Sequence, residues 1–130
     1  MLWKLFEPFQ AYGFNKAHAA SYGMVAYKTA YLKANYPAEY MTACMTAESG
    51  DIESCSEYIE EAKKIGFTIL PPDINESFSD FTVVVEGGEV TKKIRFGLNN
   101  IKNFGEEIGK AIIKERKTNG LYKNIEDFFE

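Results

Sequence analysis

The chain has 130 residues, which is enough for one compact domain or two small subdomains. No apolar run reaches the roughly 18–20 residues that span a bilayer, and no charged segment followed by an apolar one marks secretion. Two cysteines and one histidine are too few, and wrongly spaced, for a structural zinc site. We therefore expect a cytoplasmic chain with no metal or cofactor of its own, in which Cys44 and Cys55 are reduced and packed.

The net charge of −4 conceals a strong asymmetry along the chain. Residues 37–89 carry twelve acidic side chains against two lysines, whereas residues 90–124 carry nine basic side chains against three acidic ones. The first 36 residues are also basic, with four lysines and one glutamate. Basic segments on both sides of an acidic middle are suited to a polyanion, although a solvated surface with chance clustering explains them equally well.

Two helices are predicted before the first long acidic segment, over residues 1–11 and 16–35. The second has no proline and one internal glycine, and its tyrosines include Tyr22, Tyr27 and Tyr31 at helical spacing. Such an aromatic stripe more often belongs to a core than to a ligand site. Tyr22 could instead follow His18 towards a ligand.

The stretch YGFNKAHAASY joins these two helices. Gly13 favours a tight turn, and Asn15 is a strong N-cap for the second helix. The phenol of Tyr12, the ammonium of Lys16 and the imidazole of His18 would then lie where free backbone amides and the helix dipole favour an anion. A phosphate cradle is one interpretation; a capped helix start with an exposed lysine and a hydrogen-bonded histidine is the other.

Two further helices are expected in the acidic middle of the chain, over residues 37–49 and 51–65. Asp51 caps the second, Gly66 ends it, and Ile52 is expected on its buried face together with Cys55. Its glutamates form a solubilising outer face. The stretch FTILPPDIN, residues 67–75, should be an extended connector because paired prolines disfavour helix. After it, strands over 78–85 and 90–96 would form a two-stranded hairpin around Gly87-Gly88, which must pack on helices to be stable.

Residues 98–117 are spaced as two helices joined by a tight turn, and they resemble a helix-hairpin-helix motif. The usual turn of this motif has a glycine at its first and third positions. This chain has Asn103 at the first, which tolerates left-handed geometry, and Gly105 at the third. In such motifs the turn amides and the second helix start hold a DNA phosphate, and Lys102 and Lys110 could add contacts. The two glutamates that open the second helix oppose this, so a purely structural hairpin remains the alternative. A last helix is expected to begin within residues 121–130.

Three strings resemble the alpha-subunit family of the bacterial replicative DNA polymerase III: YGFNKAHAASYGMVAYKTAYLKANYPAEYM, ILPPDIN and IRFGLNNIKNFGEEIGKAII. The resemblance implies that Tyr12 and His18 approach an incoming deoxynucleotide triphosphate in the polymerase fingers, with Lys16 at a basic position between them. It also implies primer-template DNA and other replicative subunits as partners. The catalytic aspartates and their Mg²⁺ would lie in a palm upstream, so this chain alone should not polymerise.

The expected fold is mainly α: a helical fingers subdomain, a helical segment, a small β-hairpin and a helix-hairpin-helix-like motif. We assign residues 1–36 to the end of the fingers with the nucleotide-binding turn, 37–75 to the helical segment and connector, and 76–130 to the hairpin and DNA-binding region. The predicted function is part of a replicative DNA polymerase in the bacterial cytoplasm, positioning the nucleotide and supporting the DNA. The alternative is a non-enzymatic helix-hairpin-helix module that binds DNA or protein.

Overall fold

The computed structural model describes residues 16–129, and the chain divides into two compact units, residues 1–36 and 37–130. The expected fold class is confirmed, because helices dominate and the strands form one small sheet. The predicted helix over residues 1–11 and the turn at Gly13 lie outside the described residues.

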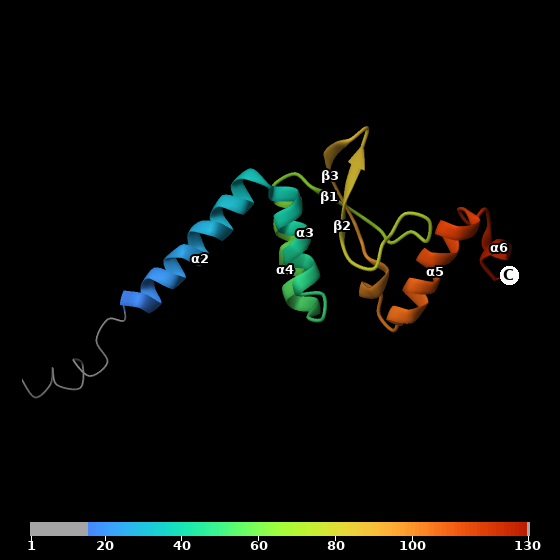
Figure 1. Cartoon of the computed structure of the whole chain (residues 1–130), viewed down its shortest axis with the longest axis horizontal. Coiled ribbons are helices and arrows are strands. Elements are labelled where there is room, and N and C mark those ends of the chain that lie inside the picture. The colour runs from blue at the N-terminus through green and yellow to red at the C-terminus, as the bar shows by residue number, and fades with distance from the viewer. Residues whose placement is uncertain (1–15, 130) are drawn as a thin grey trace, which may run out of the picture. The chain divides into compact units, whose positions relative to one another are not determined.

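The first unit contains α2, Lys16–Asn35, with the predicted bounds (Figure 1). The side-chain amide of Asn35 donates to the carbonyl of Tyr31 at 2.9 Å, which satisfies one of the acceptors left open at a helix end. The expectation that its tyrosines form a core is wrong in this structure: α2 has no buried residue, and Tyr22 and Tyr27 are 65% and 67% exposed. No helix within residues 16–129 is long and apolar enough to cross a membrane.

The second unit opens with α3, Pro37–Ala47, and α4, Ile52–Lys64, which pack against each other. The Asp51 carboxylate caps α4 by accepting from the amides of Glu53 and Ser54, as predicted. The prediction that Ile52 faces inward is wrong, because it is 73% exposed in the first turn. Both cysteines are free thiols, and burial raises the pKa of Cys55.

Three strands form the sheet of the second unit: β1, Thr68–Leu70; β2, Thr82–Glu86; and β3, Glu89–Arg95. The predicted hairpin is confirmed as the antiparallel pair β2–β3, turning at two glycines with positive φ. The sheet nevertheless has three strands and not the two that were expected. Part of the connector, β1, pairs parallel with β3 and makes β3 the central strand.

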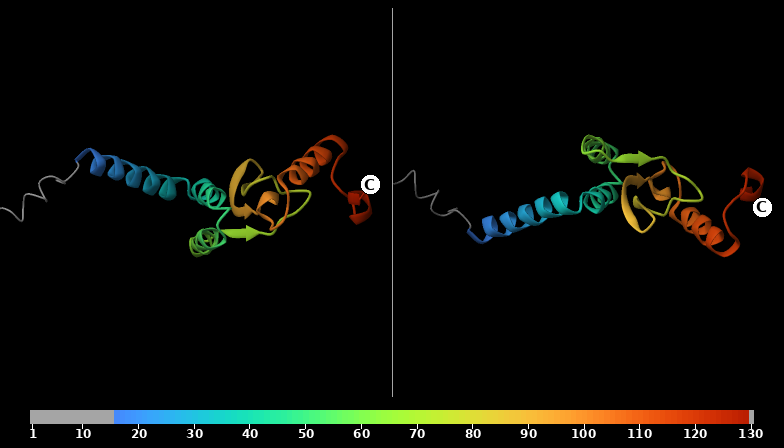
Figure 2. Two further views of the ribbon diagram at one scale, coloured as in Figure 1. Left: turned by 90° about the horizontal axis from the view of Figure 1, so that it is seen from below. Right: turned by 90° about the horizontal axis from the view of Figure 1, so that it is seen from above.

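The main core lies between this sheet and the helix pair α3–α4, which stand together beside it in Figures 1 and 2. Met41 and Met45 of α3 are fully buried, and so is Ile94 of β3. Phe81 and Phe96 meet edge to face, with ring centroids 4.7 Å apart. The sheet is thereby stabilised by helices on one face, as a small hairpin requires.

The rest of the second unit contains a single 3₁₀ turn, η1, Leu98–Asn100, followed by α5, Glu106–Asn119, and α6, Ile125–Phe129. A second, smaller core joins them, built on Leu98, Ile112 and Ile113. The last helix begins later than residue 121, because residues 120–124 cross from α5 to α6 without helical structure.

Hydrogen bonds made by residues 74–77 hold α5 and the segment that follows it in place. Asn75 exchanges two hydrogen bonds with the backbone of Tyr122, both at 2.9 Å. The buried guanidinium of Arg116, on α5, donates to the carbonyl of Ile74 at 2.6 Å. The hydroxyl of Ser77, fully buried, donates to the carbonyl of Phe96 at 2.7 Å. Residues 74–77 therefore tie the second core to Phe96, the residue after β3.

Candidate nucleic-acid interface

The predicted hairpin turn lies between η1 and α5. Asn103 has φ of 63°, so it takes the left-handed conformation that its side chain tolerates, as predicted. Gly105 is the N-cap residue of α5, and Phe104 between them packs its ring into the second core. The first helix of the motif is shorter than predicted, because only one 3₁₀ turn precedes the loop.

Two glycines allow the backbone segments around this hairpin to approach closely. A Cβ on Gly97 would lie 2.4 Å from the backbone carbonyl carbon of Asp80. A Cβ on Gly109 would lie 2.9 Å from Oδ1 of Asn99 and 3.5 Å from the Phe104 ring. These positioning residues were missed in the sequence. For Gly109, the available signal was its position four residues after Gly105, one helical turn into α5.

The structure brings three of the four predicted DNA-binding residues to one end of α5. Lys102, Asn103 and Gly105 are exposed and lie within or next to the turn. The first backbone amides of α5 have no acceptor inside the helix, and they face the same end. A helix start with exposed amides and a nearby ammonium is suited to a phosphate group.

Lys110, the fourth predicted residue, is held by acids of the first turn. Its ammonium lies 2.8 Å from the Glu106 carboxylate and 3.1 Å from that of Glu107. The hydrogen bonds that Lys110 donates to Glu106 and Glu107 raise the pKa of Lys110, and the one to Glu106 lowers the pKa of that carboxyl group. A phosphate that approached Lys110 would have to compete with these two carboxylates.

The predicted phosphate cradle at the start of α2 is described only in part. Tyr12 lies outside the described residues. Lys16 and His18 are both exposed in the first turn of α2, but two residues along a helix correspond to about 200° of rotation, so they lie on nearly opposite sides. The His18 ring lies against Tyr22, with centroids 4.4 Å apart.

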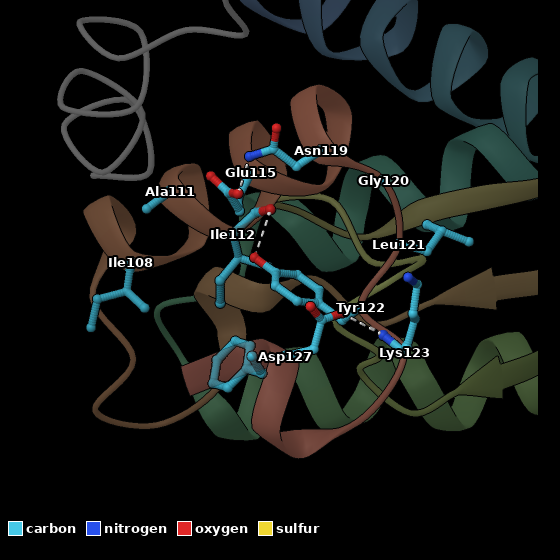
Figure 3. Close-up of a pocket in the computed structure, with 11 residues that line it drawn as sticks. Ile108, Ala111, Ile112, Glu115, Asn119, Gly120, Leu121, Tyr122, Lys123 and Asp127 are labelled. Atoms are coloured by element: carbon cyan, nitrogen blue, oxygen red, sulfur yellow. Dashed lines mark hydrogen bonds between the residues drawn. The ribbon is translucent and has the colours of Figure 1, made fainter. Parts of the chain in front are cut away.

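A hollow of about 540 Å³ in the second unit lies between α5 and the segment that carries α6 (Figure 3). The Tyr122 hydroxyl donates to the carbonyl of Ile112 across it, at 3.5 Å. The amide of Lys123 donates to Asp127 at 2.9 Å, and Asn119 pairs with Glu115. Both carboxylates of the hollow are thus engaged by neighbouring groups, and their negative charge is unsuited to a polyanion.

Comparison with known proteins identifies the hairpin and the chain around it. Residues 66–130 match the family described as the helix-hairpin-helix motif. The chain therefore belongs to the helix-hairpin-helix family, a class defined by the turn and second helix described above.

Over nearly its whole length the chain is also similar to DNA polymerase III subunit alpha. It is 50% identical to that protein of Borreliella burgdorferi over 127 residues, 98% of the chain and 10% of the relative. Identity to the Thermus aquaticus protein is 44% over 129 residues, 99% of the chain and 10% of the relative. For Helicobacter pylori it is 48% over 130 residues, 98% of the chain and 11% of the relative. The resemblance seen in the sequence is confirmed, and the chain spans about a tenth of these relatives.

Proposed function

We propose that this chain is part of a bacterial replicative DNA-directed DNA polymerase, within its alpha subunit. The observation that carries the proposal is the similarity over 95–99% of the chain to relatives all named DNA polymerase III subunit alpha. The family match at residues 66–130 supports it, since a helix-hairpin-helix motif suits a protein that works on DNA.

In this proposal the hairpin holds a phosphate of the primer-template DNA. The left-handed Asn103 turns the backbone, Gly105 removes side-chain bulk at the start of α5, and Lys102 adds a positive charge. Backbone amides cannot distinguish bases, so the contact is independent of DNA sequence, which suits a polymerase that moves along its template. Lys110 joins this contact only by leaving Glu106 and Glu107.

The start of α2 positions the incoming deoxynucleotide triphosphate. Support comes from the exposure of Lys16 and His18 at the positive end of a 20-residue helix dipole. Because these side chains project from different sides of α2, they contact different parts of the nucleotide. His18 is oriented by Tyr22, and Tyr12 completes the nucleotide contact from the preceding turn.

The chemical step takes place elsewhere in the parent protein. No group of three carboxylate, imidazole or thiol side chains among residues 16–129 is arranged to hold a metal ion, so these residues do not fit the Mg²⁺ that a polymerase uses. We propose that Mg²⁺ is bound by other parts of the polymerase, which works in the cytoplasm with other replicative subunits. Residues 1–36 end the fingers, 37–75 form the helical segment and connector, and 76–130 contact DNA.

A chimera tests the proposal. This chain replaces the matching tenth of a full-length DNA polymerase III alpha subunit, and primer extension is measured with and without substitutions. We expect the chimera to extend primers. Lys16→Ala and His18→Ala should each raise the KM for the nucleotide about tenfold, since a charge-assisted contact to phosphate contributes about 1.5–3 kcal/mol. Lys28→Ala, an exposed lysine farther along α2, is the matched control and should leave KM unchanged.

The outcomes separate the two interpretations. The 130-residue chain alone should give no extension; extension above background would show that its catalytic assignment is wrong. If the chimera folds but never extends a primer, the chain is a non-enzymatic helix-hairpin-helix module. If the chimera is active and neither Lys16→Ala nor His18→Ala changes the KM for the nucleotide, the proposed nucleotide contact is refuted, whereas the polymerase assignment is not affected.

A further inference from the structure

Strand β2 has an open edge, because β3 is its neighbour on one side and no described strand pairs with it on the other. A hollow of about 460 Å³ lies at this edge, and we call it the edge groove. Four consecutive residues of β2 line it, and they are joined by three residues from outside the strand: Thr82, Val83, Val84, Val85, Glu76, Phe78 and Arg95. Consecutive residues of a strand point to opposite faces of a sheet, so a groove lined by all four follows the edge of β2.

The backbone of β2 presents unpaired groups to the edge groove, beginning at Val83. The amide of Phe96 donates to the carbonyl of Leu70 on the β1 side at 3.0 Å, so the backbone groups of the preceding residue, Arg95, point towards β2. Arg95 lies opposite Thr82, so the backbone groups of Thr82 point inward to β3. Those of the next residue, Val83, therefore point outward.

The same alternation continues to the hairpin end of β2. The hydroxyl of Thr91 on β3 donates to the carbonyl of Val84 at 2.7 Å, so Val84 points inward and Val85 points outward. The irregularity of the hairpin lies on β3, where residues 90–94 oppose residues 83–85. Natural sheets protect open edges with lysine, proline or a bulge, and β2 itself has none of these. Val83 and Val85 thus offer the donors and acceptors that an added strand pairs with.

The edge groove also has apolar walls that an added strand would cover. Phe78 is 46% exposed and Val85 is 57% exposed. The Phe78 ring is held in place by the guanidinium of Arg116, which lies 5.3 Å from its centre. Val83 packs on the main core, so Val84 lies on the opposite face of the sheet, away from α3 and α4. Alternate side chains of an added strand would therefore find apolar contacts beside β2.

Acidic side chains border the edge groove. Glu76 lines it, and Asp80 and Glu86 lie close to the two ends of β2. Glu76 binds Arg95 and Glu86 binds Lys93, but the two glutamate side chains are still 61% and 58% exposed. Among the described residues, no basic group lies within ion-pairing distance of Asp80. The ends of the edge groove are therefore suited to cations.

We propose that the edge of β2 binds an extended segment of a partner protein, which adds a fourth strand to the sheet. The segment carries apolar side chains at alternate positions and a basic residue at each end. A second copy of this chain fits less well, because antiparallel self-pairing brings the Asp80 end of one copy to the Glu86 end of the other, where like charges oppose each other. A partner helix would leave the outward backbone groups of β2 unpaired. The inference concerns docking of a protein and goes beyond the proposed contacts with nucleotide and DNA.

The test uses the full 130-residue chain and a labelled peptide of about nine residues, in which valine and threonine alternate between a lysine at each end. Fluorescence anisotropy measures binding, and amide hydrogen exchange followed by NMR locates it. We expect the peptide to bind and to slow exchange of the Val83 and Val85 amides, because strand addition gives both of them acceptors. A control peptide with proline at its central position should bind at least tenfold more weakly.

Two variants test the edge and its charges separately. Val85→Pro removes an outward N–H, which an edge strand tolerates, and should weaken binding of the lysine-ended peptide at least tenfold. The NMR signals of Ile94, which is fully buried, verify that the sheet is still folded. Asp80→Lys with Glu86→Lys should weaken the same binding about fivefold and strengthen that of a glutamate-ended peptide by a similar factor.

The matched control for charge is Glu57→Lys with Glu60→Lys on α4, where Glu60 is paired with Lys63 as Glu86 is with Lys93. This variant changes the net charge equally and should alter neither affinity. The inference is overturned if the lysine-ended peptide does not bind, or binds without slowing exchange at Val83 and Val85. Slow exchange of these amides without peptide, increasing with the concentration of the chain, would assign the edge to a second copy instead. If charge reversal leaves the preference for the lysine-ended peptide unchanged, the basic character of the partner is refuted.

Discussion

Arg116 offers the sharpest test of how the second unit is held together. It is 8% exposed on α5, donates to the Ile74 carbonyl at 2.6 Å and lies over the Phe78 ring. No described carboxylate forms an ion pair with it. Burial is the main influence on the guanidinium and lowers the pKa of Arg116, with Asp73 acting in the opposite direction. We therefore expect Arg116→Met, which keeps the apolar stem, to destabilise the second unit by removing this pin.

The expected size follows from the contacts that methionine cannot make. A hydrogen bond from a charged donor contributes about 1.5–3 kcal/mol, and a cation over an aromatic ring adds about 0.5–1 kcal/mol. Methionine also avoids the cost of burying a charge, which offsets about 1–2 kcal/mol of that loss. The net decrease in the free energy of unfolding should be about 2 kcal/mol. That corresponds to a decrease of about 1–2 M in the urea midpoint.

The free energy of unfolding can be measured in a urea titration in which the methyl NMR signals of Ile112 and Ile113 report the folded state, because both side chains are buried in the second core. Lys117→Met is the matched control: its ammonium lies over the same ring at 5.9 Å, but the residue is exposed, so the change should be below about 0.5 kcal/mol. Equal midpoints for Arg116→Met and the unsubstituted chain would refute the view that Arg116 pins α5 to the connector.

Two further predictions concern backbone approach and helix capping. Gly97→Ala should lower the free energy of unfolding by about 2–3 kcal/mol in urea titrations, because its Cβ would lie 2.4 Å from the Asp80 backbone. Gly105→Ala, with no atom nearer than 3.7 Å and a φ of −76°, should change it by less than about 0.5 kcal/mol; equal losses would contradict the packing argument. Hydrogen bonds from Ser54 and Glu53 lower the pKa of Asp51, so its stabilising effect is complete above the ordinary pKa of 3.8 and is lost as pH falls through the lower folded value. Asp51→Asn still caps α4 but has no carboxylate to protonate. When α4 helicity is followed during acid titration, the variant should therefore not show the loss that protonation of Asp51 causes. A titration curve equal to that of the unsubstituted chain would show that the charge of the cap does not contribute.

Local signals in the sequence determined the helices and turns. Asp51 and Gly66 bound α4 because a cap and a left-handed glycine act on the adjacent backbone alone. Gly87-Gly88 turns the hairpin, and Asn103 takes positive φ, for the same local reason. The family resemblance was also readable, because the strings that carry it are contiguous.

Only the tertiary structure decided which segments meet. The connector supplies β1 because residues 68–70 find a parallel partner about 25 positions away, and such pairing leaves no local pattern. Arg116 is buried although arginine side chains are mostly exposed in proteins, because Ile74 and Phe78 of a distant segment contact it. Likewise, the lysines of α5 line a hollow only because Ser79, from a distant segment, lies beside that helix. Caps and turns depend on a few neighbouring dihedral angles, whereas burial and grooves depend on contacts between segments far apart in the chain.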